Sequence, residues 1–142
     1  MIRIHETVVS PRPVEDVFAY VADFTTVTEW DPGIASSERT SGEGGVGTTY
    51  DVVATFRGRE VPMTYEVAEY EAPARIVLHG SGSAVDAVDT IEFFADGGGS
   101  RVVYTAEFRL KGLLRFAEPF MGGMFDSLGK KAIGGLRSAL GG

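Results

Sequence analysis

The stretch of sequence that decides the fold is residues 10–34, SPRPVEDVFAYVADFTTVTEWDPGI. Pro13 suits the first position of a helix, and Glu15 and Asp16 then lie in the first turn, where the helix dipole favours acidic side chains. Apolar residues follow at the i, i+3, i+4, i+7 spacing of one helix face, namely Val14, Val17, Phe18 and Val21. This stretch therefore begins with a short amphipathic helix.

A second, shorter helix is predicted directly after the first. Thr26 and Glu29 have the spacing of a capping box, in which the two side chains satisfy backbone N–H groups at the start of a helix. The turn-forming run Asp31-Pro32-Gly33 should end this helix near Trp30. We expect Trp30 either to cap the mouth of a cavity or to hold the short helix against a sheet.

Strands are predicted on both sides of these helices. Ile2–Val9 alternates and is rich in β-branched residues, which indicates a strand. The middle of the chain reads as a meander of strands joined by four hairpin turns, which we place at Gly58-Arg59, Ala72-Pro73, Gly82-Ser83 and Asp96–Gly99. With these turns the four hairpins set Tyr50 opposite Val67, Val67 opposite Leu78, Leu78 opposite Ala87, and Asp89 opposite Ala106. All four agree on one apolar inner face, and a slip of one residue would destroy that agreement.

The chain closes with a helical pattern from Leu113 to Leu140. Its apolar residues form one stripe over about 28 residues, or ~42 Å at 1.5 Å per residue, which is long enough to cross the sheet. Pro119 lies within the first two turns and predicts either a kink or a later start of the helix.

Composition indicates one domain over residues 1–142, because a chain of this length with 44% hydrophobic residues can bury a real core. Its net charge of −7 repels phosphate backbones and anionic lipid, so we expect neither nucleic-acid binding nor membrane insertion. No apolar run approaches the ~20 residues that span a bilayer. The N-terminus lacks the features of a signal peptide, and a cytoplasmic location is expected.

Metal and phosphate sites are also disfavoured. The chain has no cysteine, which excludes disulfides and thiolate sites. His5 and His79 lack the spacing of zinc ligands. The glycine clusters at residues 42–47 and 97–99 lie between strands, so we interpret them as hairpin loops rather than phosphate-binding loops. We expect no metal and no cofactor.

Several motifs occur in a telling order along the chain: Ser10-Pro11-x-Pro13, Val17-Phe18-x-x-Val21-x-Asp23, Trp30-x-Pro32, Met63-x-Tyr65-Glu66-Val67 and Gly99-Ser100-Arg101-Val102-x-Tyr104. Together they resemble the polyketide cyclase/dehydrase family of the START-like (SRPBCC) superfamily, over essentially the whole chain. The resemblance implies an α+β helix-grip fold. In that fold a curved seven-stranded antiparallel sheet surrounds a long C-terminal helix, with two short helices between strands 1 and 2.

The same resemblance implies a hydrophobic cavity between the C-terminal helix and the concave sheet. Members of the superfamily bind lipids, sterols, polyketides, hormones or aromatic metabolites, and a minority catalyse cyclisation or dehydration of a bound polyketide. No catalytic residue is shared across the superfamily, so none is transferred to this chain. The family supports a cavity more strongly than a reaction.

Candidate ligand-binding residues follow from the inner face and the C-terminal stripe. Tyrosine hydroxyls on the inner face could bind polar groups of a ligand, and methionines suit surfaces that fit varied apolar molecules. The candidates are Trp30, Tyr50, Met63, Tyr65, Leu78, Ile91, Phe116, Phe120, Met121, Met124 and Phe125. Each could equally be a residue of the core.

Asp89 is the most unusual residue of the predicted inner face. Burial among apolar neighbours would raise its pKa and fit it for general acid or base chemistry, with Tyr104 as its partner. Alternatively, Asp89 could pair with an arginine, lie in water near the mouth, or be turned outward by a bulge.

Two functions of different classes are therefore compatible with the sequence. The first is a module that binds a small hydrophobic or amphipathic molecule of lipid, polyketide or aromatic-metabolite type. The second is a polyketide cyclase, aromatase or dehydratase that uses Asp89 and a cavity tyrosine to transfer protons. A structural or interaction domain with a filled pocket is a third reading. The sequence leaves open which ligand is bound, whether any reaction is catalysed, and whether the chain forms a homodimer.

Overall fold

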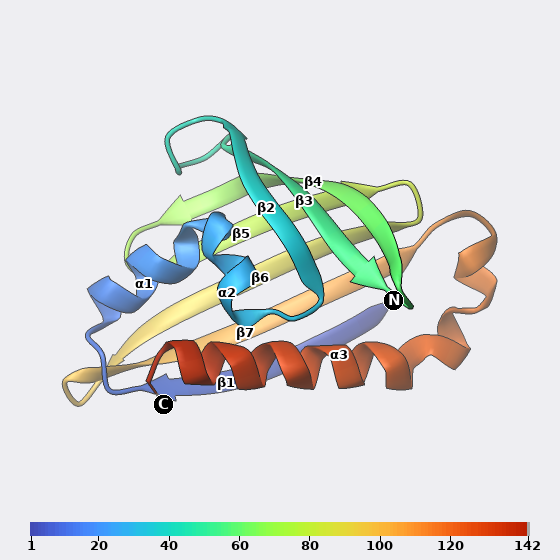
Figure 1. The fold of residues 1–142 in the computed structure, drawn as a ribbon. Coiled ribbons are helices and arrows are strands. Elements are labelled where there is room, and N and C mark those ends of the chain that lie inside the picture. The colour runs from blue at the N-terminus through green and yellow to red at the C-terminus, as the bar shows by residue number, and fades with distance from the viewer. Residues whose placement is uncertain (142) are drawn as a thin grey trace.

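The computed structural model describes residues 1–141 and contains one seven-stranded antiparallel sheet that wraps around a long helix (Figure 1). The sheet order is β1-β7-β6-β5-β4-β3-β2. The strands are β1 (Ile2–Ser10), β2 (Ile34–Ser41), β3 (Thr49–Phe56), β4 (Arg59–Glu71), β5 (Arg75–Gly82), β6 (Val85–Asp96) and β7 (Gly99–Leu110). Strands β2 to β7 each lie beside the strands that precede and follow them in the sequence, whereas β1 pairs with β7 and forms one edge of the sheet, with β2 at the other edge.

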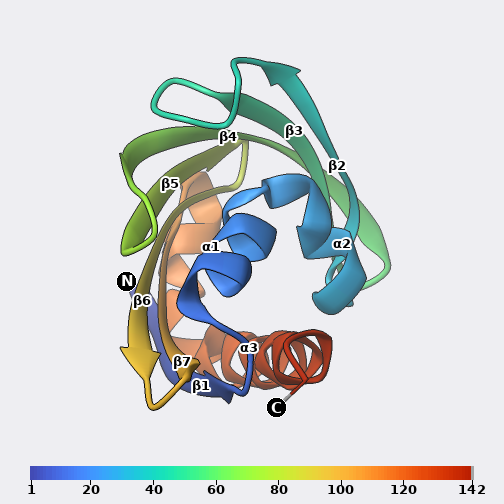
Figure 2. The same ribbon diagram turned by 90° about the vertical axis from the view of Figure 1, so that its left-hand side faces the viewer.

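The helices lie on the concave side of the sheet, as Figure 2 shows with α3 nearly end-on. They are α1 (Val14–Ala22), the 3-10 helix η1 (Phe24–Thr26), α2 (Val27–Trp30), the 3-10 helix η2 (Gly112–Phe116) and α3 (Glu118–Ala139). This arrangement confirms the expected helix-grip fold. No helix within residues 1–141 is both long and apolar enough to cross a membrane.

The long helix starts later than its apolar stripe suggests. The stripe predicts a start at Leu113, but residues 112–116 form η2, and α3 begins at Glu118 with Pro119 in its first turn. Proline is accepted there because its missing N–H would lack a partner in any case. Of the two alternatives for Pro119, the later start is the correct one.

The two halves of α3 are packed differently. In the second half, Ile133 and Leu136 are buried in the main core. A Cβ atom on Gly135 would lie 1.9 Å from the carbonyl oxygen of Trp30, so the helix backbone there rests directly on α2. In the first half, Gly122 and Gly123 face open space and Phe120 is 88% exposed.

The predicted capping box at the start of α2 is wrong. Thr26 already has helical backbone angles because η1 runs directly into α2, and its hydroxyl donates to the carbonyl oxygens of Tyr20 and Asp23 at 2.9 and 2.8 Å. Glu29 accepts a hydrogen bond from the Tyr20 hydroxyl instead. The capping side chain is Asp23, which accepts from the backbone N–H of Thr25 at 3.1 Å. The predicted end of α2 at Trp30 is confirmed.

Two of the four predicted hairpin registers are confirmed: Val67 lies opposite Leu78, and Asp89 lies opposite Ala106. Between β4 and β5 the register then shifts at a bulge between Val67 and Glu69.

The other two registers are wrong by two residues. Tyr50 pairs with Tyr65 rather than Val67, because the turn lies at Arg57-Gly58, where both residues have positive φ, as the twist of a two-residue hairpin requires. Leu78 pairs with Asp89 rather than Ala87. A shift of two residues leaves every side chain on its predicted face, so the residues predicted on the inner face stay the same despite both errors.

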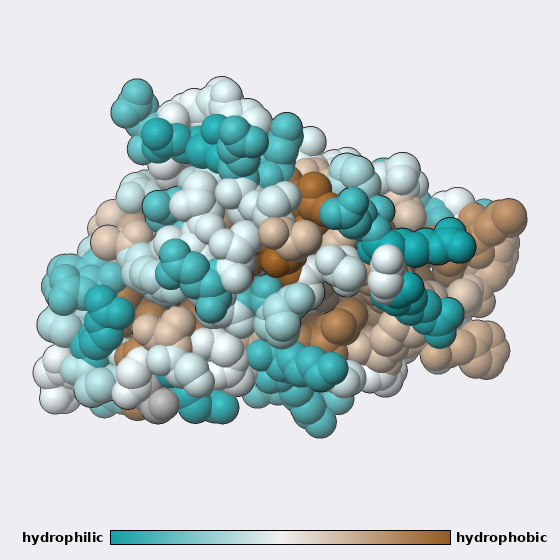
Figure 3. Space-filling model, viewed as in Figure 1, coloured by the Kyte–Doolittle hydropathy of each residue, from teal (hydrophilic) through white to brown (hydrophobic). Residues whose placement is uncertain are grey.

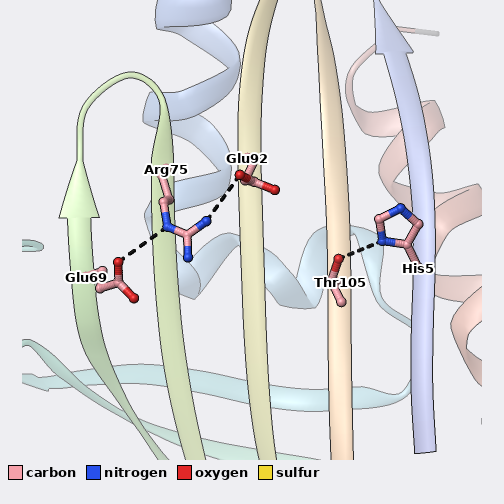
Figure 4. A network of polar contacts seen from close by, with 5 residues as sticks. All are labelled: His5, Glu69, Arg75, Glu92 and Thr105. Carbon is pink, nitrogen blue, oxygen red and sulfur yellow. Dashed lines mark hydrogen bonds and ion pairs between the residues drawn. The ribbon is translucent and has the colours of Figure 1, made fainter.

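The outer face of the sheet carries polar contacts that are open to solvent (Figure 4). The Arg75 guanidinium bridges Glu69 and Glu92 at 3.4 and 3.2 Å, and Nδ1 of His5 lies 2.8 Å from the hydroxyl of Thr105. Exposed pairs of this kind contribute little to stability. The hydrophobic core lies on the opposite, concave side.

Candidate functional site

A cavity of about 190 Å³ lies between α3, α2 and the concave face of the sheet. Its walls are mainly apolar and come from β3, β4, β6, β7 and both helices. Phe56 and Phe108 each pack against Phe125 of α3, with ring centroids 5.7 and 5.1 Å apart. At the same end of the molecule, exposed hydrophobic side chains gather over η2 and the beginning of α3 (Figure 3).

Asp89 and Tyr104 form a buried polar pair in the cavity wall. They stand on β6 and β7, two positions apart on the same face, so their side chains can meet. The Tyr104 hydroxyl donates a hydrogen bond to Oδ2 of Asp89. Burial raises the pKa of Asp89 to about 6; the hydrogen bond from Tyr104 opposes this rise and the nearby Asp31 adds to it. Asp89 therefore titrates near neutral pH.

The two tyrosines that line the cavity stay protonated. Burial, followed by the charge of Asp89, raises the pKa of both Tyr65 and Tyr104 well above the usual value. Gly80 makes room for Tyr65, because a Cβ atom there would lie 2.6 Å from the tyrosine ring. Both phenols can therefore act as hydrogen-bond donors in the wall.

Trp30 and Asp31 line the cavity from the end of α2. The Trp30 ring packs edge-on against Tyr104 with centroids 6.0 Å apart. Oδ1 of Asp31 accepts a hydrogen bond from the N–H of Gly33 at 2.8 Å. Burial raises the pKa of Asp31, and this hydrogen bond partly offsets the effect.

Seven of the predicted site residues border this cavity: Trp30, Met63, Tyr65, Asp89, Tyr104, Met121 and Phe125. The other six lie elsewhere. Three of them are fully buried in the core, because the helices α1 and η1 cover that part of the inner face: Tyr50, Leu78 and Ile91. Phe116 is 66% exposed because it lies in η2, before α3 begins, and Phe120, in the first turn of α3, is 88% exposed because its side chain points away from the sheet. Met124 is half-buried outside the lining.

Several lining residues were missed from the sequence. Phe56 and Phe108 continue the alternation of the inner face, and this pattern could have found them. Asp31 belongs to the turn that the sequence predicts after Trp30, and no local pattern marks its carboxylate as a group of the cavity wall. Ile4 and Phe24 reach the cavity through the way β1 and η1 pack, which only the tertiary structure shows.

Within residues 1–141 no group of three or more His, Cys, Asp or Glu side chains is placed to hold a metal ion. The polar side chains on the cavity wall are instead two carboxylates, two phenols, one indole and the hydroxyl of Thr55. Such a set can donate and accept hydrogen bonds, and the Asp89 carboxylate can also take up or release a proton near neutral pH.

Solved structures with the same fold cover nearly the whole chain. A START superfamily protein from Mycobacterium smegmatis matches with a TM-score of 0.82 at 12% identity, covering 98% of this chain and 97% of its own. The Zhui aromatase/cyclase from a Streptomyces species matches with a TM-score of 0.78 at 13% identity, covering 97% and 90%. A protein from Thermus thermophilus matches with a TM-score of 0.69 at 25% identity, covering 97% of both chains.

Sequence comparison gives a matching result at the level of the family. No curated protein sequence matches the chain. The family model described as polyketide cyclase / dehydrase and lipid transport matches residues 1–141. The motifs at Ser10–Asp23 and Trp30-x-Pro32, the helix-grip fold and this match agree. The chain therefore belongs to the polyketide cyclase / dehydrase and lipid transport family.

Proposed function

We propose that this protein binds a small hydrophobic or amphipathic molecule in the cavity between α3 and the sheet. The single observation that carries the proposal is the cavity itself, which remains between well-packed elements and is bordered mainly by apolar side chains. Protein interiors rarely leave spaces much larger than a water molecule, so a space of this size in a small domain supports a binding role.

The family supports the same proposal. Its description joins enzymes that act on polyketides with proteins that transport lipids, and both groups handle largely apolar molecules. The aromatase/cyclase that shares the fold shows that this architecture can also support a reaction. Binding is the property common to both groups.

A direct test combines native mass spectrometry with a binding measurement. Freshly purified protein is examined for a small molecule that co-purifies, and naphthalene binding is then measured by equilibrium dialysis. Ala132 lines the cavity from α3, so Ala132→Phe should fill the space and abolish naphthalene binding. Ala95→Phe, at an exposed position of β6, is the matched control and should bind as wild type does. Failure of the wild type to bind naphthalene would count against the proposal.

A second candidate function is proton transfer during cyclisation or dehydration of a polyketide-like substrate. The Asp89–Tyr104 pair favours it, because a buried carboxylate with a pKa of about 6 can both accept and return a proton near neutral pH. In a dehydration, Asp89 would take a proton from the carbon beside a carbonyl. A carbon–carbon double bond then forms, and the departing hydroxyl leaves as water with the proton that Asp89 returns.

This second candidate has its own test. A β-hydroxy thioester is incubated with the protein, and mass spectrometry follows the loss of one water. Asp89→Asn and Tyr104→Phe should each slow that loss, whereas Asp51→Asn, which changes an exposed carboxylate on β3, should not. A rate unaffected by Asp89→Asn would exclude this role for Asp89.

A further inference from the structure

Two buried polar atoms have no hydrogen-bond partner in the protein, and both belong to residues that line the cavity. They are Nε1 of Trp30 and Oδ1 of Asp89. The two residues are only 5% and 6% exposed, so bulk water does not compensate for the missing partners. Within the described part of the chain, no other buried side-chain nitrogen or oxygen is unpaired. Unpaired buried groups are costly in folded proteins, and their presence in two residues of one cavity wall points to a ligand that pairs with them.

The two atoms belong to one contiguous set of side chains. The Trp30 ring packs against the Tyr104 ring, and the Tyr104 hydroxyl occupies Oδ2 of Asp89, which leaves Oδ1 free. An indole N–H can only donate, and an ionised carboxylate can only accept. A ligand that satisfies both must therefore offer an acceptor and a donor. A hydroxyl group offers both in one substituent.

The charges around the cavity restrict the ligand further. Asp31 and Asp89 both border it, and none of the described lining residues is lysine, arginine or histidine. A carboxylate or phosphate on the ligand would therefore meet repulsion without a compensating cation. An ammonium group could donate to Asp89, but it has no lone pair to accept from Trp30. A neutral ligand fits both atoms.

The volume of the cavity sets the size of the apolar part. A dry cavity of roughly 150 Å³ can hold benzene. At about 190 Å³, this cavity has room for one ring or two fused rings. Its edges carry the aromatic side chains Phe56, Phe108 and Phe125, which suit a flat apolar molecule.

We propose, on the basis of the binding function above, that the cavity selects a neutral hydroxyl-bearing molecule of one or two rings. On binding, small side-chain movements bring these two closed-off atoms to the cavity surface. The ligand hydroxyl then donates to Oδ1 of Asp89, and a ligand oxygen accepts from Nε1 of Trp30. Hydrocarbons of the same shape bind more weakly because they leave both atoms unpaired. Carboxylates of similar shape bind most weakly because they also place a negative charge beside Asp89.

The test compares three probes of similar shape on the wild-type protein: naphthalene, 2-naphthol and 2-naphthoate. Equilibrium dialysis at about pH 7.5 keeps Asp89 ionised, since its pKa is about 6. We expect 2-naphthol to bind about tenfold or more tightly than naphthalene, the ratio that a hydrogen bond to a charged acceptor supplies. We expect 2-naphthoate to bind more weakly than naphthalene.

Two variants assign the preference to the two atoms. Trp30→Phe removes the N–H but keeps an aromatic ring, and Asp89→Asn removes the charge but keeps the shape. Each should reduce the preference for 2-naphthol over naphthalene by about threefold or more, since each loses one hydrogen bond or its charge assistance. Asp51→Asn, the same substitution at an exposed position of β3, should leave the preference unchanged.

The outcomes separate this inference from the proposed function. Equal affinity of the wild type for naphthalene and 2-naphthol would overturn the hydroxyl preference and leave the binding function standing. Tighter binding of 2-naphthoate than of 2-naphthol would overturn it in the same way. Binding of none of the three probes would overturn both proposals.

Discussion

Replacement of Asp89 by asparagine measures how much the buried charge of Asp89 lowers the free energy of unfolding. Burial raises the pKa of Asp89 from 3.8 to about 6. The folded protein therefore holds this proton up to about pH 6, whereas the unfolded chain releases it near pH 4. Between these values the native state binds more protons than the unfolded state. The contribution of protonated Asp89 to stability is thus fully present below about pH 4 and is lost as the pH rises past about 6.

The size of this loss follows from the shift in pKa. A rise from 3.8 to about 6 corresponds to about 3 kcal/mol, at ~1.36 kcal/mol for each pKa unit. Asparagine carries no charge at any of these pH values, and its oxygen can still accept from the Tyr104 hydroxyl. The free energy of unfolding of Asp89→Asn minus that of the wild type should therefore rise by about 3 kcal/mol as the pH increases from about 4 to 7.

Urea titrations at a series of pH values provide the assay. Trp30, the only tryptophan, is buried against Tyr104, and its fluorescence reports unfolding at the cavity. Asp51→Asn changes an exposed carboxylate and should run parallel to the wild type across the whole range. Parallel profiles for wild type and Asp89→Asn between about pH 4 and pH 7 would refute the reasoning, because they would show that Asp89 is not desolvated. A difference of the opposite sign would refute it too.

Three further predictions concern packing and are each checked by urea denaturation. Gly135→Ala should destabilise the fold by at least about 1–3 kcal/mol, since its Cβ would lie 1.9 Å from the Trp30 carbonyl oxygen. The matched control is Gly134→Ala, whose Cβ meets open space and which should stabilise the fold by up to ~1 kcal/mol. Leu78→Ala should cost about 2–5 kcal/mol, because Leu78 is fully buried, and a smaller loss would mean that the core is looser than described. Phe120→Ala should change stability by no more than about 0.5 kcal/mol, because 88% of Phe120 is exposed; a larger loss would indicate a contact that the structure lacks.

The sequence predicts which face of the sheet points inward more reliably than it predicts the pairing. Alternation of side chains places Tyr65, Asp89 and Tyr104 on the inner face, and a shift of two residues does not alter that. The pairing of Tyr50 depends on which two residues adopt positive φ in the turn. Both Arg57-Gly58 and Gly58-Arg59 contain the glycine that such a turn favours, so local sequence does not separate them.

The candidate site was predictable in the strands and less so in the helices. Asp89 and Tyr104 stand two positions apart across neighbouring strands, a relation that follows from the correct β6–β7 register. Phe116 lies in η2, before α3 begins, and Phe120 lies about 140° around α3 from Phe125, so both stay outside the cavity. A stripe shows that residues share a helix face only if the helix exists over its whole length.

The unpaired atoms of Trp30 and Asp89 could not be anticipated at all. Whether a buried polar atom finds a partner depends on side chains that meet only in the folded protein, such as Tyr104 with Oδ2 of Asp89. Composition and spacing indicate that a polar residue is buried, but they do not count its hydrogen bonds.

The unequal packing along α3 has a consequence for how the shape of the cavity can change. Gly129 and Gly135 leave no space for a larger side chain, because added Cβ atoms would meet Ile4 and Trp30. The first half of the helix contributes Met121 and Phe125 to the cavity wall, yet Gly122 and Gly123 beside them face open space. Substitutions that reshape the cavity can thus accumulate in the first half while the second half keeps the fold. In directed evolution, libraries confined to residues 118–125 should yield more folded variants than libraries over residues 129–136.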